Sequence, residues 1–210
     1  MSLKIGIVLL PDRATATLLT VLSEVASDLG NIMVLNGGAV GPRPHLSLFH
    51  MMARMHDFPR IAAAVDGLAV PGTIGGRGYK RHLVGDQWLF LQADGSGLSE
   101  LQQQVVEAVG PLRTQDVEIY WDMSPMQREA HRRYGYPNVG RAWDIHFTYG
   151  LLPKATDPRT VGPELEQIRA GMEMAQTWTA QAIAVVRVGD HGTAMEILHQ
   201  RPLTPSETPG

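Results

Sequence analysis

Two stretches of the sequence, Pro44-His45-Leu46-Ser47-Leu48 and Ile145-His146-Phe147-Thr148, repeat the order histidine, apolar residue, hydroxyl residue. Both stretches alternate in the way that is typical of a β-strand. Residues i and i+2 of a strand point to the same side, with Cα atoms about 6.6 Å apart. Each stretch therefore predicts a strand that presents an imidazole beside a hydroxyl, while Leu46 and Phe147 point into a core.

Two such strands facing each other would form a cleft with two imidazoles and two hydroxyls. A neutral imidazole can take a proton from an attacking water or hydroxyl, while an imidazolium gives a proton to the leaving oxygen. The hydroxyls can donate hydrogen bonds to the non-bridging oxygens of a phosphate and hold it in line. Histidine titrates near neutral pH, so this chemistry requires no metal ion. The pattern favours phosphodiester cleavage.

The order of elements around the two stretches also repeats. In each half of the chain, a turn-rich passage leads into the apolar strand and a helix follows. A third triplet, His191-Gly192-Thr193, falls in a predicted hairpin turn without apolar alternation, so we do not assign it to the site. Taken singly, the pattern around His45 or His146 favours a partly buried strand histidine with satisfied hydrogen bonds. The repeated frame favours a paired site over that alternative.

The two triplets resemble the paired motifs of the two-histidine (2H) phosphoesterase superfamily, which includes the bacterial 2′-5′ RNA ligase-like proteins and the cyclic nucleotide phosphodiesterases. The resemblance covers most of the chain, from the opening strand and helix to the closing hairpin. It implies an α+β fold with two pseudo-symmetric lobes, whose antiparallel sheets line a central groove.

By motif position, the resemblance implies that His45 and His146 are the catalytic acid–base pair and that Ser47 and Thr148 bind the substrate phosphate. Serine is an accepted variant of threonine in the first motif. Tyr149 stands where the family more often has an aliphatic residue, so it bears on the shape of the groove and is a candidate substrate contact.

The reaction that the resemblance implies is metal-independent hydrolysis of a cyclic phosphate on a nucleotide or RNA end, 2′,3′-cyclic or related. One alternative is a module that binds nucleotides or RNA ends without relevant turnover. Another is RNA 2′-5′ end-joining, which is the reverse reaction and uses the same residues. The sequence leaves open the cyclic phosphate, the base, the direction of reaction and which histidine is the general base.

Other side chains are weaker candidates for substrate contacts. Arg43, two residues before His45, would raise the local positive potential. Tyr134 and Tyr136 lie in a segment that mixes guanidinium groups with aromatic rings, a combination that binds phosphates and stacks on bases. An exposed helix face is the alternative there. A second basic group lies in a Gly-rich stretch that forms either an ordinary hairpin or a rim over the groove: Arg77, Lys80, Arg81 and His82.

Neither a metal site nor a cofactor is expected. The sequence has no cysteine, which excludes thiolate ligands and disulfides. A metal site that uses both His45 and His50 is disfavoured, because an odd separation along a regular strand places the two rings on opposite faces. The Gly95-Ser96-Gly97 stretch lacks the spacing of a serine-hydrolase nucleophile elbow.

The composition is that of a folded chain of 210 residues, of which 44% are hydrophobic and 19% charged. The formal net charge of −3 disfavours a binder of duplex DNA. No apolar run is long enough for a signal peptide or a membrane span, so we expect a cytoplasmic monomer whose partner is its nucleotide or RNA-end substrate. We expect one bilobal domain over residues 1–203 and a flexible tail over residues 204–210.

Hydrophobic periodicity and turn residues predict the elements along the chain. Helices are expected over residues 14–29, 58–65, 99–109 and 163–174, with a helix or an ordered loop over residues 124–134. Strands are expected over residues 4–10, 45–50, 67–70, 87–92, 117–121, 143–151, 182–188 and 193–199, the last two as a hairpin.

Overall fold

The computed structural model describes residues 2–30, 33–34, 43–70, 73–76, 79–85, 88–119, 121–152, 157, 163, 167 and 177–203, with residues 29–30, 33–34 and 79–85 described by their backbone alone. The helices are α1 (Arg13–Gly30), α2 (Phe58–Asp66), α3 (Leu98–Val109) and α4 (Pro125–Tyr134). The strands are β1 (Ser2–Pro11), β2 (Met33–Val34), β3 (Leu46–Arg54), β4 (Gly75–Gly76), β5 (Tyr79–Gly85), β6 (Trp88–Ala93), β7 (His146–Leu151), β8 (Trp178–Val188) and β9 (Ala194–Pro202).

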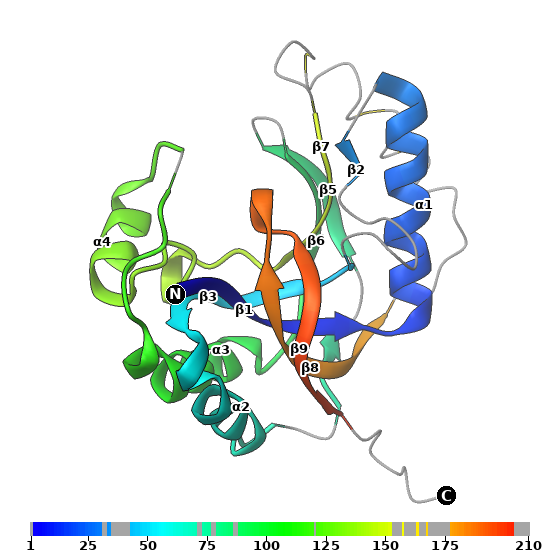
Figure 1. Cartoon of the computed structure of the whole chain (residues 1–210). Helices are drawn as coiled ribbons and strands as arrows, with labels where there is room; N and C mark the ends of the chain where they lie inside the picture. Colours follow the sequence, from blue (N-terminus) through cyan, green and yellow to red (C-terminus); the bar gives the residue numbers. More distant parts are fainter. Residues whose placement is uncertain are drawn as a thin grey trace, which may run out of the picture.

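The described strands form an antiparallel sheet in the order β4-β8-β1-β3-β7-β6-β5, with β9 paired to β8 and β2 paired to β7 (Figure 1). Two halves of this sheet meet where β3 pairs with β7. Their described contact is the single pair Leu46↔Phe147, whereas β1 and β3 pair from Ser2↔Arg54 to Leu9↔Leu46. The two expected lobes are therefore two halves of one sheet, joined at the centres of the two motifs. The predicted α+β class is confirmed.

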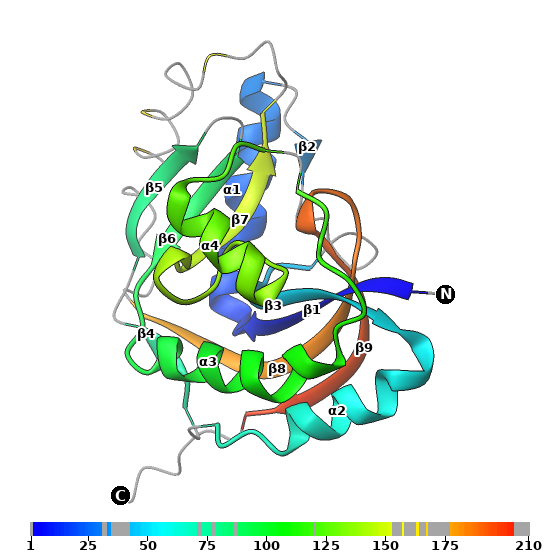
Figure 2. The same cartoon turned by 90° about the vertical axis from the view of Figure 1, so that its left-hand side faces the viewer.

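Helices α1 and α3 each pack against the half of the sheet that does not contain the strand preceding them in the sequence. Helix α1 follows β1 in the sequence but packs against β7 and β2, in the other half of the sheet (Figure 1). Helices α2 and α3 lie against the first half, α2 on β8 and β9 and α3 on β3 (Figure 2). Helix α4 stands on the side of the molecule opposite α1. Because α1 starts at the end of β1 and packs on the other half, it connects the two halves of the sheet.

The opening strand is apolar without alternation because both of its faces are covered. Ile5, Ile7 and Leu9 belong to the main core. Val8 and Leu10 belong to a second apolar cluster with the strands of the closing hairpin, β8 and β9. A short continuous apolar run is the pattern expected of a strand buried on both faces.

The segment over residues 124–134, predicted as a helix or an ordered loop, is a helix. The Ser124 hydroxyl accepts from the Gln127 amide at 3.2 Å, and the Gln127 side chain accepts from the Ser124 amide at 2.9 Å, which is a capping box. Gly135 ends the helix at φ +70°, in the left-handed region that favours glycine.

Two predicted strands are wrong. Residues 67–70 form a turn after α2, in which the carbonyls of Val65, Asp66 and Leu68 accept hydrogen bonds from Arg201 instead of from a neighbouring strand. Around Val117, which was predicted to begin a strand, the backbone pairs with the end of α4. The Val117 amide donates to the Gly135 carbonyl, and His131 Nε2–H donates to the Val117 carbonyl at 2.9 Å.

Strand β5 forms a hairpin with β6, which is one of the two expectations for the Gly-rich stretch, although its polar, glycine-flanked sequence did not predict the bounds of a strand. The predicted helix over residues 163–174 lies outside the described residues except for positions 163 and 167, which are helical. The expected tail over residues 204–210 also lies outside them. Within the described part of the chain, no helix is both long and apolar enough to cross a membrane.

Candidate active site

The two motifs lie side by side at the junction of the sheet. Leu46 and Phe147 are directly paired and 0% exposed, so both point into the core as the alternation predicts. Antiparallel pairing around these two residues sets His45 across from Thr148 and Ser47 across from His146. The four side chains are half-buried and lie on the opposite face from the core. The structure thus brings together the four residues that the motifs single out.

The two imidazoles are held in the same way. His45 Nδ1–H donates to the Arg43 carbonyl at 2.8 Å, and His146 Nδ1–H donates to the Asp144 carbonyl at 2.9 Å. A carbonyl oxygen only accepts, so in each ring the bond requires the proton on Nδ1. In the neutral ring, Nε2 then carries the lone pair. In both motifs, Nε2 is the nitrogen that this bond leaves for other partners.

The surroundings of the two rings disfavour a double positive charge. Burial lowers the pKa of His45, and hydrogen bonds to the backbone of Arg43 and Gly192 oppose this in part. Burial also lowers the pKa of His146, as does the nearby His45, whereas the Asp144 carboxylate and backbone favour the charged ring. Because each imidazolium disfavours the other, the arrangement favours a single shared proton.

The prediction that His45 and His50 face opposite sides is wrong, because β3 contains a β-bulge. The register against β1 runs Gly6↔His50, Ile7↔Phe49 and then Val8↔Ser47, so Leu48 is an extra residue. The bulge turns His50 to the face that carries Ser47, and His50 Nε2 lies 3.1 Å from Ser47 Oγ.

Helix α3 supplies the partner that the bulge needs. Gln102 is 1% exposed, and its Nε2 donates to the Leu48 carbonyl at 2.9 Å, the acceptor of the extra residue. Its Oε1 accepts from the Gly140 amide at 2.9 Å, on the segment that leads into the second motif. The Trp143 indole in this segment donates to the Ser47 carbonyl at 3.1 Å. These bonds fix both motif strands to each other.

The structure separates the weaker candidates. Arg43 is exposed, and its backbone bridges to Ala194 of β9. Tyr134 is half-buried, with the Arg133 guanidinium 5.0 Å from its ring centroid. Tyr136 is 7% exposed and packs against His50, with ring centroids 4.8 Å apart, so it supports the site from behind.

The expectation for Tyr149 is wrong. Its side chain is 0% exposed, on the core face of β7 with Phe147, because alternation from His146 holds as far as Tyr149, which is the extra residue of a β-bulge against β6. The side chain is therefore not on the face of β7 that carries His146 and Thr148. In the second basic group, Arg77 lies outside the described residues, and the side chains of Lys80, Arg81 and His82 are not described.

Aromatic residues beside the second motif were missed from the sequence. The centroid of the Phe90 ring lies 4.3 Å from that of the His146 ring. The Trp88 ring is nearly parallel to the Phe90 ring, with 6.3 Å between their centroids. His191, from the turn that was set aside as a chance triplet, has its ring 5.8 Å from Trp88. The alternation of Trp88 and Phe90 with Leu89 and Leu91 could have indicated that the two aromatic side chains share a face.

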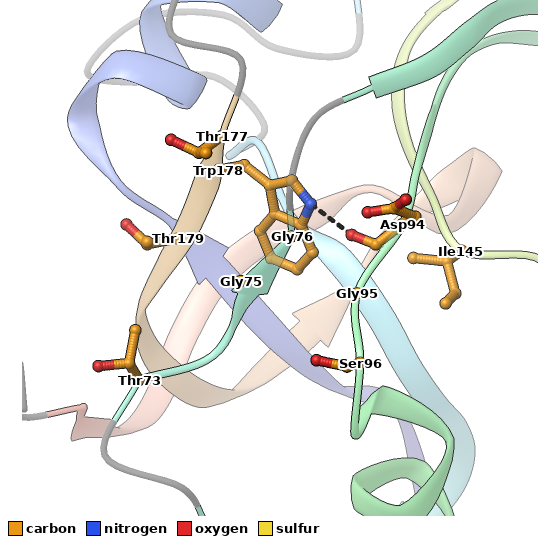
Figure 3. Close-up of a pocket in the computed structure, with 10 residues that line it drawn as sticks. All are labelled: Thr73, Gly75, Gly76, Asp94, Gly95, Ser96, Ile145, Thr177, Trp178 and Thr179. Atoms are coloured by element: carbon orange, nitrogen blue, oxygen red, sulfur yellow. Dashed lines mark hydrogen bonds between the residues drawn. The ribbon is translucent and has the colours of Figure 1, made fainter.

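A separate cavity of about 790 Å³ lies near the start of β8, and none of the four motif residues lines it (Figure 3). Trp178 closes one side, where its indole N–H donates to the Asp94 carbonyl at 2.8 Å (Figure 3). Ile145, which directly precedes His146, is also part of the wall. Among the described residues, no group of three or more histidine, aspartate or glutamate side chains could hold a metal ion.

Solved structures of other proteins have a similar fold. TT0787 of Thermus thermophilus superimposes with a TM-score of 0.57 at 16% identity, over 97% of this chain and 99% of that one. E. coli LigT complexed with phosphate has a TM-score of 0.54 at 9% identity, over 97% and 98%. Kluyveromyces marxianus Usb1 with uridine monophosphate has a TM-score of 0.53 at 14% identity, over 95% and 98%.

The chain has the 2H phosphoesterase fold. Identities this low show the fold alone, over nearly the full length of both proteins. No family model matches the sequence, and no curated protein is similar to it. The fold that the resemblance of the motifs predicts is thereby confirmed, independently of those motifs.

Proposed function

We propose that the protein hydrolyses a cyclic phosphate on a nucleotide or RNA end, with His45 and His146 as the acid–base pair. The observation that carries the proposal is that both rings make the same hydrogen bond. In each motif, Nδ1–H of the histidine donates to the backbone carbonyl two residues earlier. Two imidazoles with this orientation, each beside a hydroxyl, suit general acid–base catalysis at phosphorus. A structural histidine needs no such matched partner.

In the proposed reaction, the base imidazole takes a proton from water at Nε2 while the water oxygen forms a bond to phosphorus. The bond from phosphorus to one ribose oxygen breaks, and the other ring, as imidazolium, gives its proton to that oxygen. The product is a phosphate monoester. At the end of the reaction, the base ring has gained one proton and the acid ring has lost one. Ser47 and Thr148 bind non-bridging phosphate oxygens and hold the phosphorus in line.

We assign the acid role to His146. The Asp144 carboxylate favours the charged form of its ring and raises its pKa against the effect of burial. The carboxylate is itself held by Gln92 Nε2 at 2.7 Å. No carboxylate is among the groups that shift the pKa of His45, which suits that ring to the role of base.

A nucleotide substrate is supported by the aromatic side chains beside His146. Trp88 and Phe90 are half-buried on the groove face of β6, next to the second motif, and can stack on a base. The structures compared above include LigT complexed with phosphate and Usb1 with uridine monophosphate. A phosphate with a base attached is therefore the ligand class that we propose.

The test is hydrolysis of a panel of cyclic phosphates in excess EDTA by the wild type, His45→Ala and His146→Ala. The panel contains the four 2′,3′-cyclic mononucleotides, ADP-ribose 1″,2″-cyclic phosphate, an oligonucleotide with a cyclic end and a cyclic dinucleotide. Each substitution is expected to lower kcat/KM at least about 100-fold. The fold should remain intact by circular dichroism, and exposed His56→Ala serves as the control.

The double variant should lose less than the product of the two single losses, because the pair acts as a unit. Wild-type activity in both single variants would refute the mechanism. Tight binding of product nucleotides without any turnover would identify a binding module, and joining of RNA ends in preference to hydrolysis would identify the reverse direction.

A further inference from the structure

The bulge in β3 places a third histidine against the first motif. His50 is 5% exposed, and its Nε2 lies 3.1 Å from Ser47 Oγ. The ring is enclosed on several sides: Tyr136 packs against it at 4.8 Å between centroids, and Gly6 faces it from β1. The His50 ring, which is the partner of the Ser47 hydroxyl, is therefore held in place by the residues packed around it.

The environment keeps the His50 ring neutral. Burial lowers the pKa of His50 well below the ordinary value, and the positive charges of Lys4 and His45 lower it further. Lys4 lies two residues from Gly6 along β1 and is itself partly buried. A neutral imidazole carries one N–H and one lone pair, so its Nε2 either donates to the Ser47 hydroxyl or accepts from it.

The proposed role of Ser47 decides between these two states. A phosphate oxygen only accepts hydrogen bonds, and the hydroxyl of serine has a single proton. If that proton were bonded to His50, Ser47 would meet the phosphate with lone pairs alone. A serine that binds phosphate must therefore accept its bond from His50.

We propose that His50 is a positioning residue, which donates from Nε2–H to Ser47 Oγ and thereby aims the hydroxyl proton of Ser47 at a phosphate oxygen. The inference rests on the proposed function through the role of Ser47. The two motifs differ at this point, because Leu151 stands in the second motif where His50 stands in the first. The β-branched Thr148 has restricted χ1 rotamers, whereas the hydroxyl of Ser47 needs an external partner to fix it.

Binding of inorganic phosphate tests the inference without any turnover. Calorimetry is to be compared for the wild type, Ser47→Ala, His50→Phe, His50→Gln and the double variant Ser47→Ala/His50→Phe. His50→Phe keeps a ring against Tyr136 but cannot donate, and we expect it to weaken phosphate binding about tenfold, as should Ser47→Ala. His50→Gln should recover most of the affinity, because its amide can donate from a similar position.

The double variant should bind no more than twofold more weakly than Ser47→Ala alone, because His50 acts only through the hydroxyl. Wild-type affinity in His50→Phe, or losses that multiply in the double variant, would overturn the inference. So would a wild-type protein that binds no phosphate. Melting curves of each variant separate these results from unfolding.

Nitrogen-15 NMR of the wild-type histidine rings gives a readout that a packing role would not produce. The His50 signal, assigned by its loss in His50→Gln, should show a neutral ring with the proton on Nε2 between pH 6 and 8. A proton on Nδ1 would overturn the inference. If the wild type binds phosphate but hydrolyses no member of the panel, the proposed function fails while these two measurements still decide the role of His50.

Discussion

The two motif histidines are oriented by backbone carbonyls. The carbonyls of Arg43 and Asp144 fix the proton of each motif histidine on Nδ1. Such a bond sets the tautomer of the ring, and therefore which nitrogen faces the reaction. Neither carbonyl can be recognised in the sequence, because any residue type supplies one. The side chain at position 144, by contrast, changes the charge near His146.

Asp144→Asn is expected to move one limb of the pH profile of kcat/KM. Loss of the carboxylate removes the interaction that favours the charged His146 ring, so the pKa of His146 falls further below its ordinary value. If His146 is the acid, activity on the alkaline side should be lost at lower pH than in the wild type. The profile is measured with the best cyclic phosphate, and Asp116→Asn, at an exposed carboxylate, is the control. A shift of the acidic limb instead would assign His146 as the base.

At the scale of single elements, the bulge in β3 decides which side chains enter the site. The sequence predicted the orientation of His45, Ser47 and Leu46, because alternation holds over those residues. It failed at His50, since a bulge depends on the register against β1 and on Gln102 of a distant helix. Tyr149 was misplaced for the opposite reason: its motif position suggested the groove, while the alternation from His146 to Tyr149, which ends at the bulge in β7, buries its side chain.

Gln102→Leu is expected to destabilise the protein by about 2–4 kcal/mol. The Leu48 carbonyl is buried, so the loss of its partner costs about 1–3 kcal/mol, and the amide of the exposed Gly140 loses a hydrogen bond worth about 1 kcal/mol. Gln103→Leu is the matched control on the same helix, where the side chain is exposed and bonds only Glu107 among the described contacts. Urea unfolding measures both variants. Equal stability of Gln102→Leu and the control would show that the bulge does not depend on this contact.

At the scale of the whole molecule, the two halves of the sheet meet at the strand pair Leu46↔Phe147 within the part of the chain that the structure describes, and α1 crosses between them. The repeated turn, strand and helix in the sequence predicted the pseudo-symmetric halves. The sequence could not show that they form a continuous sheet, because that depends on pairing between strands about one hundred residues apart. The predicted strands over residues 67–70 and 117–121 failed for a related reason, since Arg201 and His131 bind their backbone from elsewhere.

The stability of the molecule is expected to fall as the pH drops below about 6.5. Burial lowers the pKa values of His45, His50 and His146 below the ordinary 6.5, so the unfolded chain binds protons that the folded chain does not. Stability is therefore fully present above pH 6.5 and is lost as the pH falls toward the folded-state pKa values. Asp12, whose pKa hydrogen bonds lower despite its burial, adds a loss only below about pH 4.

The melting temperature measured from pH 8 to pH 5 checks this expectation, at about 2–4 °C for each kcal/mol lost. His50→Phe should melt with a shallower dependence on pH than the wild type, because one of the three rings with a lowered pKa no longer titrates. His56→Phe, at an exposed position, controls for the change in composition. A dependence as steep in His50→Phe as in the wild type would show that His50 does not contribute.

The absence of a side chain at Gly6 is expected to restrict which residues occur together at positions 6 and 50 among homologues. A Cβ atom built there would lie 3.1 Å from His50 Cδ2 and 3.0 Å from Val188 Cγ2, tighter than nine in ten real contacts. Space for the ring at position 50 therefore depends on glycine at position 6, on another strand. Among homologues of this chain, we expect the two positions to vary as a pair: histidine at 50 should accompany glycine at 6, and larger residues at 6 should accompany smaller ones at 50.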